Sequence, residues 1–303
     1  MKRIFIVYNP RSSRYTEVKE AVLDKLANLS GYIVGKYEVQ KGNVDDNAIL
    51  FAKLLKDGDT VIAAGGDATG VIAVNGILKS GKDVTLGVLP FGNFNDLART
   101  MGTKTFEDVF GDDVKVQKYY PLEIIVDGKL FRYATCYTTI GMMAEAVHLY
   151  DQPKMRKILK KASGRNVGSY TNLASWYFKN RHKKKFLPKF KLNGELMPNK
   201  TSDYAAMNGK YMARVMKGGD DYKDPKIFRS KTDRLTNFWR LFKLMMKSMF
   251  KRVPGKETTR DLLEFMEPGA MEIQAEGEYK TFVDVNKIEI RKSKKCLKII
   301  TSS

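Results

Sequence analysis

The sequence predicts an α/β protein with an N-terminal parallel-sheet domain over residues 1–121 and a β-rich second domain over residues 122–289. Three observations lead to this prediction. Apolar strands alternate with helical patterns through the first part, which is typical of a parallel sheet with right-handed crossovers. Glycine-rich turns follow two of these strands. After Pro121 the pattern changes to paired apolar runs joined by short turns.

The first domain is expected to repeat a strand and a helix. β-Branched and aromatic residues mark the strands, whereas apolar residues at helical spacing mark the helices. The predicted strands cover 3–8, 32–39, 60–64 and 84–89, and the predicted helices lie near 15–29, 45–56, 70–80 and from about residue 94 onward.

Two hairpins are predicted in the second domain. Residues 122–133 hold two apolar runs around Asp127-Gly128, and residues 186–198 contain Asn193-Gly194. Asp-Gly and Asn-Gly suit two-residue hairpin turns, because both central positions of such turns adopt a positive φ. Antiparallel structure therefore begins near residue 121, where we place the domain boundary.

The strand that ends at Ala64 leads into a turn whose residues suit an anion-binding site. Gly65 and Gly66 let backbone N–H groups approach a phosphate, and the helix N-terminus that follows presents unpaired donors and a positive dipole end. Asp67 stands at the mouth of this anion site, where a metal ion or a proton transfer would explain a carboxylate. Taken alone, the turn also fits an ordinary connection between strand and helix.

Two further strand ends carry similar residues. Gly92 and Asn93 follow the strand 84–89, and Asn95 and Asp96 stand at the next helix start, where they also suit helix capping alone. The first strand leads into residues 9–13. Because the carboxyl ends of neighbouring parallel strands face one crevice, these three loops are expected to form one site.

The charge of the chain points to an anionic partner. Lys and Arg number 54 against 34 Asp and Glu, which gives a formal charge of +20. The basic stretches 154–165 and 179–191 lie beside aromatic residues and suit an anionic membrane surface, although a solvated face is the alternative. Residues 238–252 could form an amphipathic basic helix that lies on a bilayer or packs on its own domain. No nucleic-acid motif is visible.

The two cysteines and the lengths of the apolar segments indicate the cellular compartment of the protein. Cys136 and Cys296 have no metal-ligand spacing and imply neither a disulfide framework nor a zinc site, which fits a reducing cytoplasm. No stretch is long and apolar enough to cross a bilayer, and Lys2-Arg3 precede an apolar run too short for a signal peptide. We expect a cytoplasmic protein at the inner face of the membrane, and a homodimer is compatible with the sequence.

The order and spacing of three motifs resemble the diacylglycerol kinase catalytic-domain family, which includes sphingosine and ceramide kinases and bacterial lipid kinases. The motifs are Asn9-Pro10-Arg11-Ser12-Ser13, Gly65-Gly66-Asp67-Ala68-Thr69 and Gly92-Asn93-Phe94-Asn95-Asp96, with Ala275-Glu276-Gly277-Glu278 near the end. The resemblance implies ATP-dependent phosphorylation of a membrane-lipid hydroxyl, with diacylglycerol as the default substrate and Mg²⁺ as the metal. It also implies an ATP-binding domain completed by a C-terminal return over about 290–303, and a lipid-substrate domain over 122–289.

The resemblance also suggests roles for individual residues. Glu278 is the first candidate for general base and Asp67 the second, while Asp67 and Asp96 are candidates to organise the metal. Asp233 is a candidate ligand for a structural Mg²⁺ in the second domain. The expected nucleotide-binding residues are Asn9, Pro10, Arg11, Ser12, Ser13, Gly65, Gly66, Asp67, Ala68, Thr69, Gly92, Asn93 and Asn95.

Two alternatives remain open. A soluble-substrate kinase similar to NAD kinase shares the Gly-Gly-Asp turn, although the motif at residues 92–99 favours the lipid branch. A catalytically weak lipid-binding or nucleic-acid-binding relative is the other alternative. It is motivated by Ala68 and Ser13, which stand where the family usually has glycine and where a Cβ would hinder a positive φ or a close approach to the nucleotide.

Overall fold

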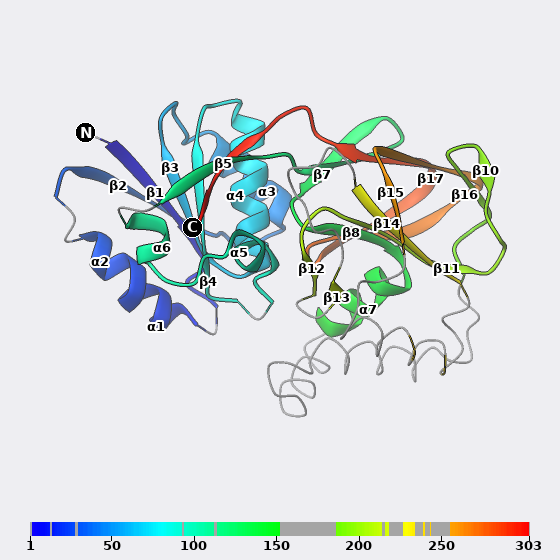
Figure 1. The fold of residues 1–303 in the computed structure, drawn as a ribbon, viewed down its shortest axis with the longest axis horizontal. Helices are drawn as coiled ribbons and strands as arrows, with labels where there is room; N and C mark the ends of the chain where they lie inside the picture. The colour runs from blue at the N-terminus through cyan, green and yellow to red at the C-terminus, as the bar shows by residue number, and fades with distance from the viewer. Residues whose placement is uncertain are drawn as a thin grey trace. The chain divides into compact units, whose positions relative to one another are not determined.

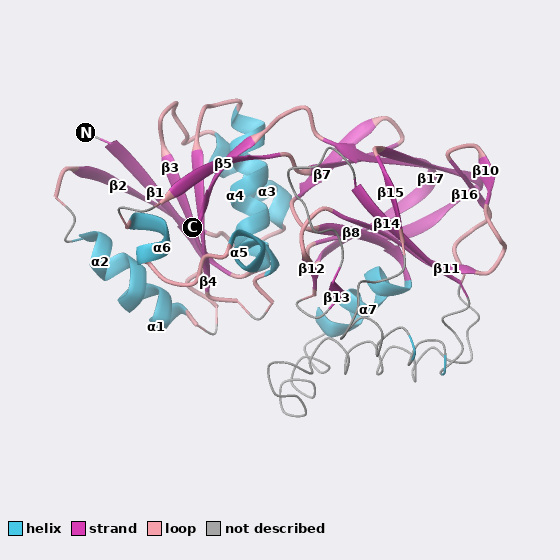
Figure 2. Cartoon of the chain, in the orientation of Figure 1, coloured by secondary structure: helices cyan, strands magenta, loops and turns pink. Residues whose placement is uncertain are grey.

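The computed structural model describes residues 2–12, 14–27, 30–92, 94–111, 114–151, 186–213, 216–217, 227–233, 239, 243 and 255–302 (Figure 1). Contacts between Cα atoms divide the chain into two units. Unit 1 comprises residues 1–121 and 293–303, and unit 2 comprises residues 122–292. Figure 2 shows helices and strands interleaved in unit 1, whereas strands dominate unit 2.

Unit 1 is built on a six-stranded sheet with the order β2-β1-β3-β4-β18-β5. The strands are β1 (Lys2–Tyr8), β2 (Tyr32–Glu38), β3 (Thr60–Gly65), β4 (Thr85–Pro90), β5 (Lys115–Tyr119) and β18 (Leu297–Thr301). All neighbours are parallel except β5, which runs antiparallel to β18. The C-terminal strand therefore lies inside the sheet, between β4 and β5.

Helices cover both faces of this sheet. They are α1 (Tyr15–Val18), the π-helical stretch η1 (Lys19–Leu23), α2 (Asp24–Ala27), α3 (Val44–Ala52), α4 (Asp67–Ser80), α5 (Asp96–Met101) and α6 (Glu107–Phe110). Ile4 and Ile6 pack with Val22 on one face, while the ring of Phe5 contacts Phe51 of α3 on the other. Successive residues of β1 alternate between the two covered faces, so the strand is apolar from Ile4 onward.

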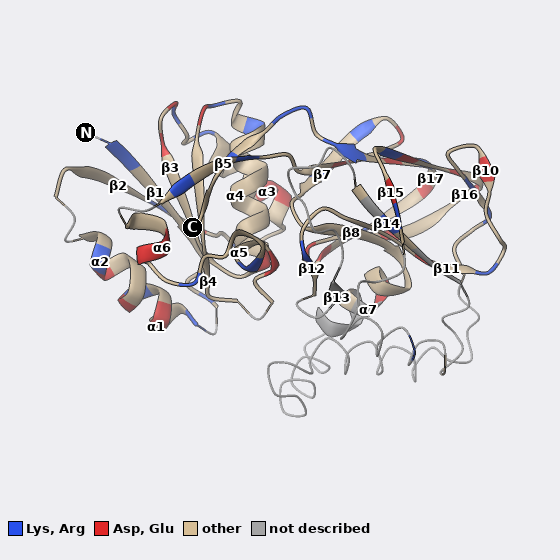
Figure 3. Cartoon of the chain, viewed as in Figure 1, with Lys and Arg blue, Asp and Glu red and all other residues tan. Residues whose placement is uncertain are grey.

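Helix α4 is the central helix of unit 1. Every residue from Thr69 to Leu78 is buried, and Figure 3 draws most of α4 without charged residues. A Cβ on Gly76 would lie 2.6 Å from Cδ1 of Phe51, so this glycine permits the close packing of α3 on α4. Only Gly66 separates the end of β3 from the start of α4, so the N-terminus of α4 lies at the carboxyl end of β3.

Unit 2 contains a sheet with the order β15-β14-β11-β8-β16-β17-β6-β7. In addition, β9 pairs with β16 and with β10, and β12 and β13 pair separately. Its core includes Ile124, Leu263, Ile273 and Ile288. The elements are β6 (Leu122–Val126), β7 (Lys129–Ala134), β8 (Tyr137–Gly141), α7 (Met142–Asp151), β9 (Phe190–Leu192), β10 (Glu195–Leu196), β11 (Thr201–Met207), β12 (Tyr211–Met212), β13 (Met216–Lys217), β14 (Ile227–Asp233), β15 (Lys256–Thr258), β16 (Arg260–Ala275) and β17 (Glu278–Lys292).

The predicted fold class is confirmed, with a parallel sheet followed by a β-rich part. Both predicted hairpins form, and Asp127, Gly128, Asn193 and Gly194 adopt the expected positive φ. Residues 154–165 and 179–185, and the segment 238–252 apart from Trp239 and Lys243, lie outside the described residues. Within the described part of the chain, no helix is both long and apolar enough to cross a bilayer.

Candidate active site

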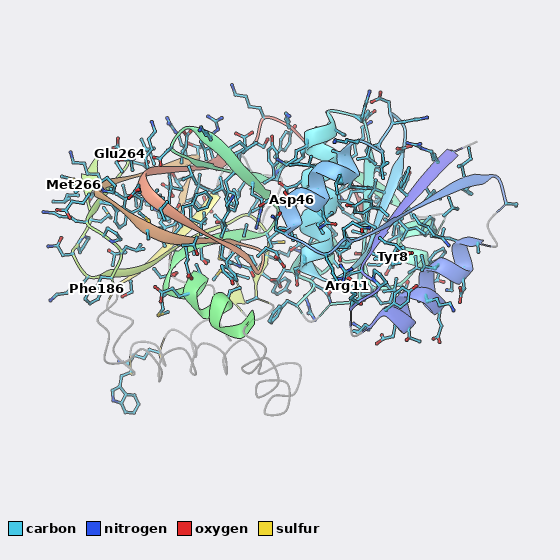
Figure 4. All side chains as sticks on the ribbon, turned by 180° about the vertical axis from the view of Figure 1, so that it is seen from behind. Tyr8, Arg11, Asp46, Phe186, Glu264 and Met266 are labelled. Carbon is cyan, nitrogen blue, oxygen red and sulfur yellow. The ribbon has the colours of Figure 1, made fainter. Side chains whose placement is uncertain are left out.

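The loop after β1 is closed by Asn9. Its Oδ1 accepts the backbone N–H of Arg11 at 3.0 Å, and its carbonyl accepts the N–H of Ser12 at 3.0 Å. Figure 4 labels Tyr8 at the end of β1 and Arg11 in this loop. Arg11 Nη2 donates to the carbonyl of Val39 at 2.6 Å, which ties the loop to the segment that follows β2. Ser13 lies outside the described residues.

Tyr8, the last residue of β1, directly precedes this loop. Its hydroxyl donates to Oε1 of Glu38 at 2.6 Å, and its ring stacks on Tyr15 with the centroids 5.9 Å apart. Burial, and then the hydrogen bond to Glu38, raise the pKa of Tyr8 above its ordinary value. Tyr8 therefore stays protonated and holds the carboxyl end of β1 against β2 and α1.

The two glycine turns touch through their backbones. A Cβ on Gly66 would lie 3.1 Å from Cα of Gly92, and a Cβ on Gly92 would clash with Cα of Gly66 and lie 2.8 Å from Oδ1 of Asn95. The N–H of Phe91 donates to the carbonyl of Gly65 at 3.0 Å. A side chain at either glycine would thus meet the backbone of the other turn, which explains why glycine occupies both positions.

Asn95 closes the second turn. Its Oδ1 accepts the N–H of Gly92 at 2.7 Å and its Nδ2 donates to the carbonyl of Gly92 at 2.9 Å. Asn95 has φ 57° and ψ 43°, a left-handed conformation that asparagine tolerates better than most residues. Both ends of its side-chain amide are therefore engaged within the turn, and a direct contact of this side chain with a nucleotide stays a prediction.

Asp67 joins the first turn to the second. Its Oδ2 accepts the N–H of Asn95 at 3.1 Å, and its Oδ1 accepts the N–H of Asp96 at 2.9 Å. Desolvation raises the pKa of the Asp67 carboxyl above its ordinary value, while these two backbone hydrogen bonds act in the opposite direction. The carboxylate thus occupies the N-terminus of α5.

Asp67 is also the first residue of α4, a 14-residue helix. The N-cap residue of α4 is Gly66, which has no side chain to accept a hydrogen bond from the first turn. Ala68 lies in that turn and is not among the residues with a positive φ. Its Cβ therefore costs no backbone strain, and the expected conflict with a positive φ at this position was wrong. Thr69 is buried, with its Oγ1 against Gly65.

Arg14 supports the site, although the sequence analysis did not identify it. Its Nη1 donates to the carbonyl of Pro90 at 3.2 Å, its guanidinium lies 5.7 Å from the centroid of the Phe91 ring, and it pairs with Glu17. It therefore fastens the second turn to the start of α1. The sequence carries no signal for this contact, because 76 residues separate Arg14 from Pro90.

In unit 2, Glu278 is the first residue of β17 and follows a two-residue turn. Glu276 and Gly277 have φ values of 53° and 87°, as a hairpin turn of this type requires. Glu278 is half-buried, and its carbonyl accepts a hydrogen bond from Nη1 of Arg132 at 2.9 Å. Because the structure does not place the two units relative to each other, a shared site of Glu278 and Asp67 stays a prediction.

The candidate metal ligands are arranged differently. Asp96 is buried beside Asp67, whose Oδ1 accepts its N–H. Among the described residues, no group of three or more histidine, cysteine or acidic side chains is arranged to hold a metal ion. One or two carboxylates suffice for Mg²⁺ when substrate phosphates complete its shell, so Asp67 and Asp96 fit that pattern. Asp233 ends β14, but its side chain is outside the description.

The first part of unit 1 is similar to known proteins. Residues 3–119 match the family model of the diacylglycerol kinase catalytic domain. A diacylglycerol kinase of Bacillus subtilis is 38% identical over 104 residues, which cover 34% of this chain and 34% of that protein. A diacylglycerol kinase of Staphylococcus aureus is 32% identical over 130 residues, which cover 42% of this chain and 37% of that protein.

Residues 3–119 belong to the diacylglycerol kinase catalytic-domain family. The segments that match these curated relatives span about a third of the relatives' lengths. This kinase-family domain contains both glycine turns and Asp67, whereas Glu278 lies outside the matched residues. A crystal structure of a diacylglycerol kinase from Bacillus anthracis covers 99% of this chain and 96% of its own, with a TM-score of 0.69 and 17% identity. At that identity the likeness establishes the fold.

Proposed function

We propose that this protein is an ATP-dependent lipid kinase that phosphorylates a hydroxyl of a membrane lipid, with diacylglycerol as the first candidate and phosphatidic acid as its product. The observation that carries the proposal is the pair of glycine turns beside the N-terminus of α4, in a domain of the diacylglycerol kinase family. A helix N-terminus without a capping side chain offers backbone donors and a positive dipole end to a phosphate.

Unit 1 supplies the nucleotide site in this proposal. The loop 9–12 and the turns at residues 65–69 and 92–96 would surround the triphosphate of ATP, and the first-turn N–H groups of α4 would bind its oxygens. The α5 N-terminus is a poorer phosphate site because Asp67 already accepts its N–H groups. Asp67 and Asp96 would hold Mg²⁺, which offsets phosphate charge when it is bound.

In this proposal, unit 2 binds the lipid whose hydroxyl accepts the phosphate and supplies the general base. Glu278 would accept the proton of the lipid hydroxyl as that oxygen attacks the γ-phosphorus of ATP, and ADP would leave. A carboxylate on a strand that begins at a tight turn has a fixed backbone position, which supports this assignment. Asp67 is the second candidate for the base.

The membrane partner in this proposal is inferred from the net charge of the chain. With a formal charge of +20, the chain is suited to an anionic surface, and the basic stretches 154–165 and 179–191 are the proposed contacts. Peripheral attachment at the cytoplasmic face would bring the enzyme to its lipid. Binding to vesicles should require anionic lipid and weaken steeply with salt, because surface charges are screened over about 10 Å at 0.1 M salt. Equal binding to neutral vesicles would contradict this attachment.

Phosphate transfer is the decisive test. Purified protein is incubated with Mg²⁺ and ATP labelled at the γ-phosphate, either with a lipid extract in mixed micelles or with NAD⁺. The labelled product is then identified by mass spectrometry. The proposal predicts label in phosphatidic acid or another phospholipid. Label in NADP⁺ would instead identify a soluble-substrate kinase, and ATP binding without any transfer would identify a catalytically inactive relative.

A further inference from the structure

A group of buried polar residues ties three strand ends together in unit 2, at the end where β17 begins. Thr135 and Cys136, between β7 and β8, lie at its centre and are fully buried. The N–H groups of Asn208 and Gly209, which follow β11, donate to the carbonyl of Cys136 at 2.7 and 2.9 Å. Asn208 Nδ2 also donates to the carbonyl of Thr135 at 2.9 Å.

Glu276 connects the hairpin turn to this group. Its side-chain oxygen Oε1 accepts both the hydroxyl of Thr135 and the N–H of Cys136. Glu276 is only 5% exposed, although it stands in a two-residue turn, where a polar side chain normally points to water. A buried carboxylate is costly unless hydrogen bonds satisfy it, so these two donors account for its position.

The turn held by Glu276 leads directly into Glu278. Ala275 and Glu278 are opposite each other in the ladder of β16 and β17, with Glu276 and Gly277 as the only residues between them. Arg132, which is also buried, donates to the carbonyl of Glu278. The backbone of Glu278 is therefore fixed by Arg132, and the turn before it is fixed by Glu276.

We infer that Glu276 is a positioning residue that sets the location of Glu278 through the anchored turn. The inference rests on the proposed function, in which Glu278 is the general base. Glu276 acts through its hydrogen-bonding oxygen and takes no proton from the substrate. Because misplacement of a catalytic group by about 1 Å can cost about 10²-fold in rate, loss of the anchor should lower kcat while the nucleotide site in unit 1 is unaffected.

Three variants separate positioning from proton transfer. Glu276→Gln retains an oxygen that can accept both hydrogen bonds, so it should keep most of kcat. Glu276→Leu has similar size without an acceptor, and its kcat should fall by about 10²-fold at unchanged KM for ATP. Thr135→Val removes one donor and should give a smaller fall, which keeps the test available if the leucine variant does not fold.

Asp127→Leu is the matched control. Asp127 also stands in a two-residue turn of unit 2, and its carboxylate accepts the backbone N–H groups of Asn286 and Lys287 further along β17. Loss of a turn carboxylate away from Glu278 should leave kcat within about twofold of the wild type, because the start of β17 is not moved. Thermal unfolding and ATP titration of each variant show whether both units are intact.

The outcomes are distinguishable. A Glu276→Gln variant as slow as Glu276→Leu would overturn the inference and show that the charge of Glu276 itself is needed. An active wild type whose Glu276→Leu and Thr135→Val variants keep their kcat would also overturn it, while the proposed function would stand. A wild-type protein that transfers no phosphate would overturn the proposed function and this inference together.

Discussion

Two parts of the molecule carry the candidate residues and are built in different ways. In unit 1, glycines bring two turns into backbone contact, and the proposed donors for a phosphate are main-chain N–H groups of α4. In unit 2, the turn before Glu278 is held by a buried side chain, Glu276, whose partners Thr135 and Cys136 come from another strand connection. The first part depends on the absence of side chains and the second on their presence.

The two parts should therefore respond differently to amino-acid substitutions. An added Cβ should disrupt the first part, because the neighbouring backbone cannot move away without displacing its whole turn. The second part should tolerate a change of charge where an acceptor oxygen is retained. Substitutions that affect ATP binding are therefore expected in unit 1, and substitutions that affect only transfer are expected in unit 2.

The largest effect is predicted for Gly92→Ala. The new Cβ would clash with Cα of Gly66 and approach Oδ1 of Asn95, so the two turns must separate and ATP binding should be lost. Gly70→Ala, within α4, is the control, because the new Cβ would meet only Cδ2 of Leu97 in α5, at 4.0 Å. Alanine there should even stabilise the helix by about 0.5–1 kcal/mol. Calorimetric titration with ATP and thermal unfolding measure both effects; ATP binding by the Gly92→Ala variant would refute the interlocked turns.

The next largest effect is predicted for Glu278→Gln. Glutamine matches the size of glutamate but cannot accept a proton, so turnover should fall by roughly 10²–10⁴-fold with ATP affinity preserved. Rate measurements at saturating lipid and direct ATP titration test the two parts of this prediction. A fall of less than about fivefold, which is well below that range, would move the base to Asp67.

A smaller effect on binding, with a distinct pH signature, is predicted for Asp67→Asn. Hydrogen bonds to charged groups contribute about 1.5–3 kcal/mol, so the loss of charge at the α5 N-terminus should weaken ATP binding by roughly 10- to 100-fold, and turnover should fall with it. Asp57→Asn is the control, because that exposed carboxylate accepts the N–H of Asp83 away from both glycine turns. Near-normal activity of the Asp67→Asn protein would remove Asp67 from the site.

The raised pKa of Asp67 gives a pH test of the same variant. Between the ordinary pKa of aspartate, about 3.9, and the raised folded-state pKa, the folded protein binds more protons than the unfolded chain. Asp67 therefore contributes a stability term that decreases as pH rises through this window and is constant above it. The free energy of unfolding of the wild type minus that of Asp67→Asn should fall with pH accordingly. A difference that rises with pH would mean that the pKa is lowered.

The smallest effect is predicted for Ala68→Gly. Because Ala68 already has a helical backbone, glycine relieves no strain, and ATP affinity should stay within about twofold. Stability should decrease by about 0.5–1 kcal/mol, since glycine gains conformational freedom in the unfolded chain. Denaturant unfolding and ATP titration of the purified variant are sufficient. A large gain in affinity would show that the Cβ of Ala68 obstructs the nucleotide.

The sequence predicted the features that depend on local pattern. Alternating strands and helices, the Asp127-Gly128 hairpin and the two glycine turns each follow from residues close together in the chain. It could not predict the contacts that fix the candidate site. Arg14 contacts Pro90 over a separation of 76 residues, and Thr135 contacts Glu276 over a separation of 141. The apolar pattern of residues 297–301 likewise indicates a strand but not its place between β4 and β5.

Local pattern also left the partners of single residues open. Asn95 is the N-cap residue of α5, as its position suggested, but its side chain binds Gly92 and the carboxylate of Asp67 accepts the N–H groups of Asn95 and Asp96. Which donor meets which acceptor depends on the packing of two turns that lie 28 residues apart in the sequence. The spacing of motifs in the sequence predicts that these turns lie close together, but it does not predict which donor bonds to which acceptor.

The central claim is that unit 1 binds ATP and unit 2 supplies the base for transfer to a lipid. It is tested most directly by measuring the ATP dissociation constant and the rate of phosphate transfer to diacylglycerol on the same preparations of wild type, Gly92→Ala and Glu278→Gln. The account predicts that Gly92→Ala loses both, and that Glu278→Gln keeps ATP binding and loses transfer. A Glu278→Gln protein that transfers phosphate at the wild-type rate, or a Gly92→Ala protein that binds ATP normally, would contradict it.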